Sequence, residues 1–358
     1  MASIIDYLTQ GSRIFFTSWK NRVMPKQYQG NPEEICKQIV QDCWNGRFFQ
    51  TSTTNFPQFW TRDFGWTTQA LLKLKYQKEV QRTLRYALNR FVAYGKITTS
   101  ITPTGKPFDF PTEAVDTLPW LIHSIKLSKF SYHSFIPFLN KEIKKYFEKF
   151  IDQMGLVKPD LHVSSIKDFA IRKSSCYDNS MVALLAKDLK KMKLNNPFKE
   201  FDYPALLKRH FWNGEYFHDD LQLKHYVAGD ANLFPFLFGL GSEAMLKKSL
   251  HNVHAAGLEY PLPLKYTSSR RDVDFIFDEI FLRNYESDAC WMHMGPLYVK
   301  LVGQVNKKKA KELKERITES IITHKNFLEV FNSRGKPYGS PFYYCDRGMI
   351  WAANYLML

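Results

Sequence analysis

Apolar residues recur at the spacing of an α-helix along most of this chain, and this pattern constrains the fold more than any other feature. Val80, Leu84 and Leu88, for example, lie on one helical face. Alternating patterns typical of strands are rare, and short extended pieces are expected only near 97–102 and 215–227. The pattern predicts an all-α protein of about ten to twelve helices, with less than about a tenth of its residues in strands.

The helices form a single series along the chain. No linker rich in Pro, Gly or Ser divides the 358 residues, so we expect one helical domain over 1–358, with 1–50 as an N-terminal helical segment. Loops rich in polar and aromatic residues recur at intervals of roughly fifty residues, a spacing that fits helical hairpins. Two architectures satisfy this pattern, an open α-solenoid and a closed barrel of hairpins. In a barrel, the loops would meet at one end and form a pocket.

The charge and the cysteines narrow the class of protein. The net charge of +15 is compatible with nucleic-acid binding. Lysines mix with glutamates at helical spacing in 307–316, however, so a solvated surface is the better interpretation and nucleic-acid binding is not expected. The five cysteines contain no CxxC pair, and the chain shows neither a long apolar stretch nor a signal sequence. We expect a cytoplasmic protein without a membrane span, a disulfide framework or a zinc site.

Two carboxyl groups carry the strongest indication of chemistry. Asp178 follows an aromatic residue and precedes small polar residues, and Glu329 precedes the turn-rich segment 332–341. Hydrolysis of a glycosidic bond needs one carboxyl group that protonates the leaving oxygen and another that accepts a proton from water. A carboxyl group on each of two distant, aromatic-rich loops is what such an enzyme needs.

Polar residues beside aromatic rings on the other loops predict the rest of a sugar site. Charged side chains can hold sugar hydroxyls, and flat rings can stack on sugar faces. Asp63, Asp116 and Asp178 also suit the first turn of a helix, where aspartate caps free N–H groups, so a structural role stays open for each. The predicted substrate-binding residues are Trp60, Arg62, Asp63, Asp116, Trp120, Tyr177 and Trp291.

The order of these motifs resembles that of the six-hairpin, (α/α)6-barrel glycosidases, which include trehalases, processing α-glucosidases, glycogen-debranching glucosidases and neutral invertases. The run Ser174–Ser180, for instance, resembles their Glu-Ser-Gly-aromatic-Asp-x-Ser segment, although Ser, Ser and Cys replace Glu, Ser and Gly. The resemblance covers residues from about 55 to 358. The segments that carry it are 60–66, 174–180, 211–219, 291–298, 327–341 and 350–356.

The resemblance implies an (α/α)6 toroid and an inverting glycoside hydrolase that acts on an α-linked or fructoside-containing small saccharide. It implies that Asp178 is the general acid, that Glu329 is the general base, and that neither a metal nor an organic cofactor is required. The same fold can instead serve a phosphorylase, in which phosphate would take the role of Glu329, or a sugar isomerase or epimerase. A third hypothesis is a non-enzymatic scaffold that binds nucleic acid or protein through a basic face and has no enclosed acidic pocket.

Overall fold

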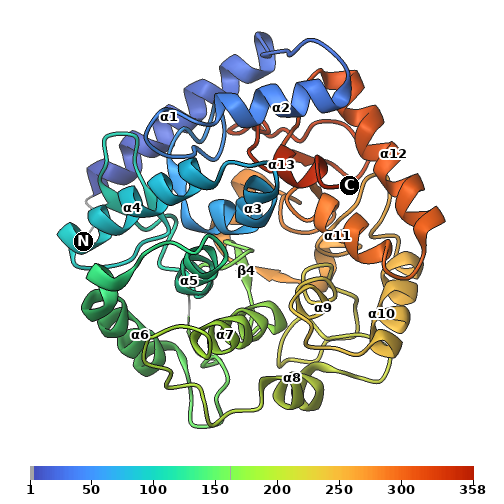
Figure 1. Ribbon diagram of the computed structural model, residues 1–358. Coiled ribbons are helices and arrows are strands. Elements are labelled where there is room, and N and C mark those ends of the chain that lie inside the picture. Colours follow the sequence, from blue (N-terminus) through green and yellow to red (C-terminus); the bar gives the residue numbers. More distant parts are fainter. Residues whose placement is uncertain (1–3, 162) are drawn as a thin grey trace.

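Helices form two concentric rings in the computed structural model of the protein, which describes residues 4–161 and 163–358 (Figure 1). Each helix of the inner ring packs against the next, and the last returns to pack against the first. The ring is therefore closed, which confirms the all-α (α/α)6 toroid and excludes the open solenoid. The inner helices are α3 (Thr61–Lys73), α5 (Thr117–Leu127), α7 (Cys176–Leu189), α9 (Phe234–Leu237), α11 (Gly295–Val302) and α13 (Ala352–Tyr355).

An outer ring of helices surrounds the inner one, and each outer helix precedes an inner helix in the chain (Figure 1). These pairs are the six hairpins. A further helix, α1 (Ile4–Val23), precedes the first hairpin and forms hydrogen bonds to loop residues Asn55, Asp109 and Ser340. The outer helices are α2 (Pro32–Asp42), α4 (Gln77–Tyr94), α6 (Ile136–Phe150), α8 (Tyr203–Phe211), α10 (Glu243–Ala255) and α12 (Lys307–His324).

The sequence pattern explains which helices lie inside. Every residue of α7 except Lys187 is buried, as expected for a helix that has neighbours on all sides. In α12, by contrast, only Leu313, Ile317 and Ile321 are buried, and the remaining faces carry lysines and glutamates. A single apolar stripe fixes α12 to the ring, whereas an apolar surface all round places α7 within it.

The strands are two residues long and link the loops. One antiparallel sheet joins β1 (Phe59–Trp60), β2 (Ser100–Ile101) and β3 (Pro107–Phe108), with Phe59 opposite Ile101. The piece expected near 97–102 therefore contains β2, whereas 215–227 contains only an isolated bridge from Phe217 to Trp212. The other strand pairs are β4 (Ala170–Ile171) with β5 (Asp274–Phe275), and β6 (Cys290–Trp291) with β7 (Val330–Phe331). The short 3-10 helices are η1 (His133–Phe135), η2 (Arg270–Asp272) and η3 (Phe277–Leu282).

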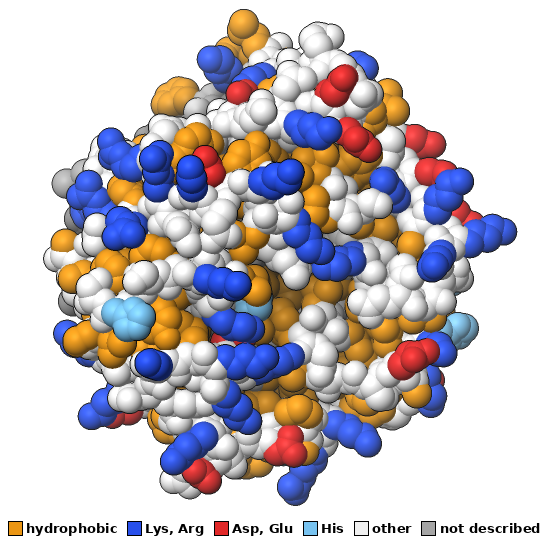
Figure 2. Space-filling view, in the orientation of Figure 1, with side chains coloured by type: hydrophobic (Ala, Val, Ile, Leu, Met, Phe, Trp, Pro, Cys, Tyr) orange, Lys and Arg blue, Asp and Glu red, His pale blue; other side chains and the backbone are white. Residues whose placement is uncertain are grey.

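Lysine and arginine side chains are spread over the face of the molecule shown in Figure 2, with acidic side chains sparse among them. This distribution agrees with the net charge of +15. The five cysteines are buried and free. Within residues 4–161 and 163–358, we find no helix whose length and apolar character would allow it to cross a bilayer.

Close packing of α3 on α5 generates a first prediction. A Cβ atom on Gly65 would lie 2.6 Å from the Cβ of Trp120, so a side chain at this position forces the two helices apart. We expect Gly65→Ala to lower the free energy of unfolding by about 1–3 kcal/mol, the usual cost of overpacking, despite the better helix propensity of alanine. Urea denaturation measures the change.

Gly11 in α1 provides the matched control, because a Cβ atom there would meet nothing within 4 Å. Gly11→Ala should raise the free energy of unfolding by up to about 1 kcal/mol. A Gly65→Ala variant as stable as the wild type would contradict the close approach of α3 and α5.

Candidate active site

A cavity of about 290 Å³ opens where α3, α11 and α13 begin. Its wall contains Arg62 from the first turn of α3, His293 from just before α11 and Trp351 from just before α13. Helix N-termini carry partial positive charge, which favours carboxylates and the oxygens of a ligand at this end of the ring. Of the predicted site residues, Trp60, Arg62, Asp63, Trp291 and Glu329 line the cavity.

The Glu329 carboxyl group is held by three donors. Its Oε1 accepts a hydrogen bond from the Tyr285 hydroxyl at 2.6 Å. Its Oε2 accepts one from the Tyr343 hydroxyl and another from the Asp346 N–H at 2.8 Å. Burial and the charge of Asp346 raise the pKa of Glu329 to about 7, against the effect of these donors. A fixed carboxyl group that titrates near neutral pH is suited to exchanging a proton with water.

Asp63 has a role other than helix capping. The N-cap of α3 is Trp60, and no side chain caps this helix. Asp63 instead accepts a hydrogen bond through Oδ1 from Trp351 Nε1 at 2.9 Å, which joins the first inner helix to the last. Burial raises the pKa of Asp63 to about 7, although Arg62 and Trp351 favour its charged form. The capping alternative is therefore wrong for this residue.

Asp116, Trp120 and Tyr177 lie behind Arg62 and do not line the cavity. Arg62 Nε is 2.6 Å from Asp116 Oδ2, which also accepts a hydrogen bond from the Tyr177 hydroxyl at 2.8 Å. Trp120 Nε1 donates in turn to the Tyr177 oxygen at 3.2 Å. Burial opposes the charge of Arg62, but Asp116 and Asp168 raise its pKa above the usual value. In this arrangement the three predicted binding residues orient the Arg62 side chain.

Asp178 lies outside the cavity that Glu329 lines. Its two oxygens accept hydrogen bonds from the hydroxyls of Ser165 at 2.6 Å and Ser175 at 2.7 Å. Ser175 is also the N-cap of α7, so Asp178 takes part in closing the first turn of that helix. It lines a separate cavity of about 140 Å³, bounded by the segment 163–172. Because Ser165 covers its carboxyl group, the predicted pair does not share one cavity.

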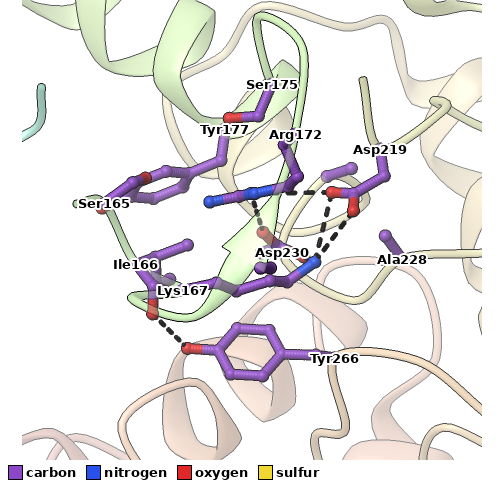
Figure 3. A network of polar contacts seen from close by, with 12 residues as sticks. Ser165, Ile166, Lys167, Arg172, Ser175, Tyr177, Asp219, Ala228, Asp230 and Tyr266 are labelled. Atoms are coloured by element: carbon purple, nitrogen blue, oxygen red, sulfur yellow. Dashed lines mark hydrogen bonds and ion pairs between the residues drawn. The ribbon is translucent and has the colours of Figure 1, made fainter. Parts of the chain in front are cut away.

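A buried ion cluster fixes the segment that covers Asp178 (Figure 3). The Lys167 ammonium is fully buried and lies 3.0 Å from Asp219 and 3.1 Å from Asp230. Arg172 Nη1 lies 3.1 Å from Asp230 and 3.6 Å from Asp219. Tyr266 adds a hydrogen bond from its hydroxyl to the carbonyl oxygen of Ile166 at 2.8 Å. Two positive and two negative side chains thus hold the middle of this segment, at Lys167, and its end, at Arg172.

Two further carboxyl groups, Asp168 and Glu286, line the cavity and were not predicted. The oxygens of Glu286 accept hydrogen bonds from the backbone N–H groups of Asp168, Phe169 and Ala170 at 2.6–3.2 Å. Burial and the charge of Asp168 raise the pKa of Glu286 to about 8. Burial also raises the pKa of Asp168, whose Oδ1 lies 3.9 Å from Arg62 Nη1. In the sequence, Asp168 precedes Phe169 and Glu286 follows Tyr285. This pairing of an acidic with an aromatic residue, which also occurs at Tyr177–Asp178, is the sequence pattern that indicates both carboxyl groups.

Aromatic rings form much of the cavity wall, and some of their polar atoms have no partner. Trp66 stacks on His293 with ring centroids 4.3 Å apart. Within the described part of the chain, Trp60 Nε1, Trp66 Nε1 and His293 Nδ1 are buried without a hydrogen-bond partner. Burial and the charge of Arg62 lower the pKa of His293 far below its usual value, so its ring is neutral. Buried polar atoms normally have partners, and sugar hydroxyls, which both donate and accept hydrogen bonds, are suitable ones.

The cavity bears on the scaffold hypothesis drawn from the sequence. Asp63, Asp168, Glu286 and Glu329 all line it, whereas the scaffold hypothesis predicted no enclosed acidic pocket. Among the residues that the structure describes, no group of three or more His, Cys, Asp or Glu side chains is arranged to hold a metal ion.

Solved structures with the same architecture include several sugar-cleaving enzymes. A rhamnosidase from Klebsiella oxytoca with rhamnose bound matches with a TM-score of 0.66 and 8% sequence identity, over 93% of this chain and 64% of the rhamnosidase chain. A wild-type glycosidase matches with a TM-score of 0.61 and 10% identity, over 98% of this chain and 96% of the other. The chain has the (α/α)6-barrel fold of glycosidases.

A third structure, the GH63 mannosylglycerate hydrolase from Thermus thermophilus with Tris and D-glycerate, matches with a TM-score of 0.61 and 10% identity. The match covers 90% of this chain and 98% of the hydrolase chain. The chain thus spans about two thirds of the rhamnosidase and nearly all of the other two. No protein-family model and no curated protein matches the sequence.

The raised pKa of Asp63 predicts how stability depends on pH. The folded-state pKa of about 7 exceeds the ordinary 3.8, so between these values the unfolded chain releases a proton that the folded protein keeps. This group therefore lowers the stability of the wild type as pH rises from about 4 to 7, by up to about 1.4 kcal/mol per pH unit. Asp63→Asn removes the titration and keeps an acceptor for Trp351.

The measurement is the free energy of unfolding of both proteins by urea at pH 5 and pH 7. The Asp63→Asn variant should gain about 2 kcal/mol relative to the wild type between these two pH values. A difference between the two proteins that does not change with pH would show that Asp63 titrates near its ordinary value.

Proposed function

We propose that the protein is a glycoside hydrolase that cleaves an α-linked or fructoside-containing small saccharide with inversion at the anomeric carbon. The observation that carries this proposal is the Glu329 carboxyl group, held by Tyr285, Tyr343 and the Asp346 N–H in the wall of an aromatic cavity. The glycosidase fold and the other carboxyl groups of the cavity add support.

In the proposed mechanism Glu329 is the general base. Its carboxylate takes a proton from a water molecule as the water oxygen attacks the anomeric carbon on the face opposite the leaving group. Arg62 and Asp63 hold hydroxyls of the sugar through charged hydrogen bonds. Trp60 and Trp291 offer flat faces for the ring. The donors on Glu329 fix the direction from which the water attacks.

The general acid protonates the leaving oxygen as its bond to the anomeric carbon breaks. In inverting enzymes it stands about 6.5–9.5 Å from the base. The sequence predicts Asp178 for this role, on the condition that Ser165 and Ile166 withdraw so that Asp178 opens onto the cavity. Asp168 is the second candidate, because it already lines the cavity and because burial raises its pKa, the direction of shift that a general acid requires.

Kinetics of three variants test these roles. Glu329→Gln should lower turnover by about 100- to 10,000-fold on every substrate, because each reaction needs an activated water. Loss of the acid should lower turnover most for alkyl glycosides and least for 4-nitrophenyl glycosides, whose leaving group needs little protonation. Whichever of Asp178→Asn and Asp168→Asn shows this dependence on the leaving group identifies the acid.

The substrate panel consists of α-glucosides, α-mannosides, α-rhamnosides, trehalose and sucrose, and thermal melting of each variant verifies that it is folded. Proton NMR of the first product formed reports whether the anomeric configuration is inverted. Full activity of Glu329→Gln would contradict the mechanism. Turnover that requires inorganic phosphate and yields a sugar phosphate would favour the phosphorylase, and no turnover of any substrate would favour the scaffold.

A further inference from the structure

The cavity changes its chemical character from floor to mouth. The carboxyl-bearing residues of its floor are almost inaccessible, with Asp63 8% and Glu329 3% exposed. The most exposed large side chains of its wall are phenylalanines, Phe15 at 43%, Phe281 at 45% and Phe342 at 53%. A ligand that fills the cavity therefore meets charged and polar groups at its inner end and hydrocarbon at its outer end.

Three separate segments build this apolar mouth. Phe15 comes from α1, Phe281 from η3, and Phe342 from the loop that leads to α13. The rings of Phe281 and Phe342 are in edge-to-face contact at 5.2 Å. α1 is fixed to the barrel beside them, since Arg13 donates hydrogen bonds to the carbonyl oxygen of Asn55 and the side chain of Gln58. The mouth thus has a wall of aromatic rings contributed by three separate segments of the chain.

The apolar surface continues beyond the mouth as a shallow groove. This groove, of about 30 Å³, shares Phe15, Phe342 and Tyr343 with the cavity and runs along α1, where Trp19 lines it together with Ser18 and Arg22. Trp19 is 61% exposed, so its ring forms an open apolar side of the groove. A group that reaches from the cavity floor to Trp19 passes through both the mouth and the groove, which suits an extended chain better than a compact group.

The cost of removing water distinguishes the two kinds of group that could occupy the mouth, a second sugar ring and a hydrocarbon chain. A second sugar ring in the mouth would stack a C–H face on these rings, but its hydroxyls would lose water without gaining hydrogen bonds, because phenylalanine side chains offer none. A hydrocarbon chain would gain about 0.8 kcal/mol for each methylene group removed from water, a factor of about 4 in binding. On the basis of the proposed function, we propose that the substrate is an amphiphilic glycoside, with its sugar on the cavity floor and a linear hydrocarbon aglycone in the mouth and the groove along α1.

The test compares methyl and octyl α-glycosides of glucose, mannose and rhamnose, below the critical micelle concentration. Methoxide and octoxide are similar leaving groups, so a difference in kcat/KM reports the contact with the chain. We expect kcat/KM for the octyl glycoside to exceed that for the methyl glycoside by at least about 100-fold, which burial of about four methylene groups supplies.

Substitutions at the mouth locate the contact. Phe342→Ser and Phe281→Ser should each lower the octyl-to-methyl ratio of kcat/KM by about 10-fold. Phe16→Ser is the matched control, because Phe16 is an exposed neighbour of Phe15 on α1 that does not line the cavity, and the ratio should not change. Since the readout is a ratio within one protein, a general loss of activity in a variant does not affect it.

The results separate this inference from the proposed function. Equal kcat/KM for octyl and methyl glycosides, or a disaccharide hydrolysed better than the octyl glycoside, would overturn the inference and leave the glycosidase intact. If no glycoside is hydrolysed, the proposed function fails, and calorimetric binding of octyl and methyl α-glucoside decides the inference. Tighter binding of the octyl compound that Phe342→Ser abolishes supports the apolar mouth, and equal or absent binding overturns it.

Discussion

The buried ion cluster of Lys167, Arg172, Asp219 and Asp230 determines how the candidate site is formed. Removing four charged groups from water is costly, and only close pairing in a neutral cluster compensates for it. The paired charges of Lys167 and Arg172 stabilise the observed conformation of the segment from 164 to 172. That conformation covers Asp178 with Ser165 and places Asp168 in the cavity wall. Both candidates for the general acid therefore depend on the same four charges.

The cavity is lined by several carboxyl groups whose pKa values are raised, so that their charged forms are disfavoured. Burial raises the pKa values of Asp63, Glu286 and Glu329 to about 7, 8 and 7, and like charges contribute at Glu286 and Glu329. Titratable groups shifted in this way are common at catalytic sites, where a proton must be held or moved near neutral pH. Glu286 differs from the other two, because both its oxygens accept hydrogen bonds from the backbone. It orders the loop that carries Asp168, whereas Glu329 binds mainly side chains and faces the cavity.

The sequence predicted the closed barrel through the order of its motifs, and helical periodicity predicted its α-helical content. Of the site residues predicted from the sequence, the structure brings Trp60, Arg62, Asp63, Trp291 and Glu329 to one cavity. The covering of Asp178 by Ser165 could not be predicted from the sequence. It depends on the ion pair between Lys167 and Asp219, which are 52 residues apart, and no local pattern indicates that pairing. Asp116 and Tyr177 resemble exposed ligands in the sequence, and only the packing shows that Arg62 lies between them and the cavity.

The closure of the ring between its first and last helices constrains how this protein is made. Trp351 donates to Asp63 across a separation of 288 residues, and α13 packs between α3 and α11. Until the ribosome has added the last hairpin, the sides of α3 and α11 that will receive α13 have no partner. Such surfaces favour aggregation, and contacts between distant residues slow folding. The nascent barrel thus depends on its final hairpin, and a chaperone that shields these two helices during synthesis would act at the step when the protein is most vulnerable.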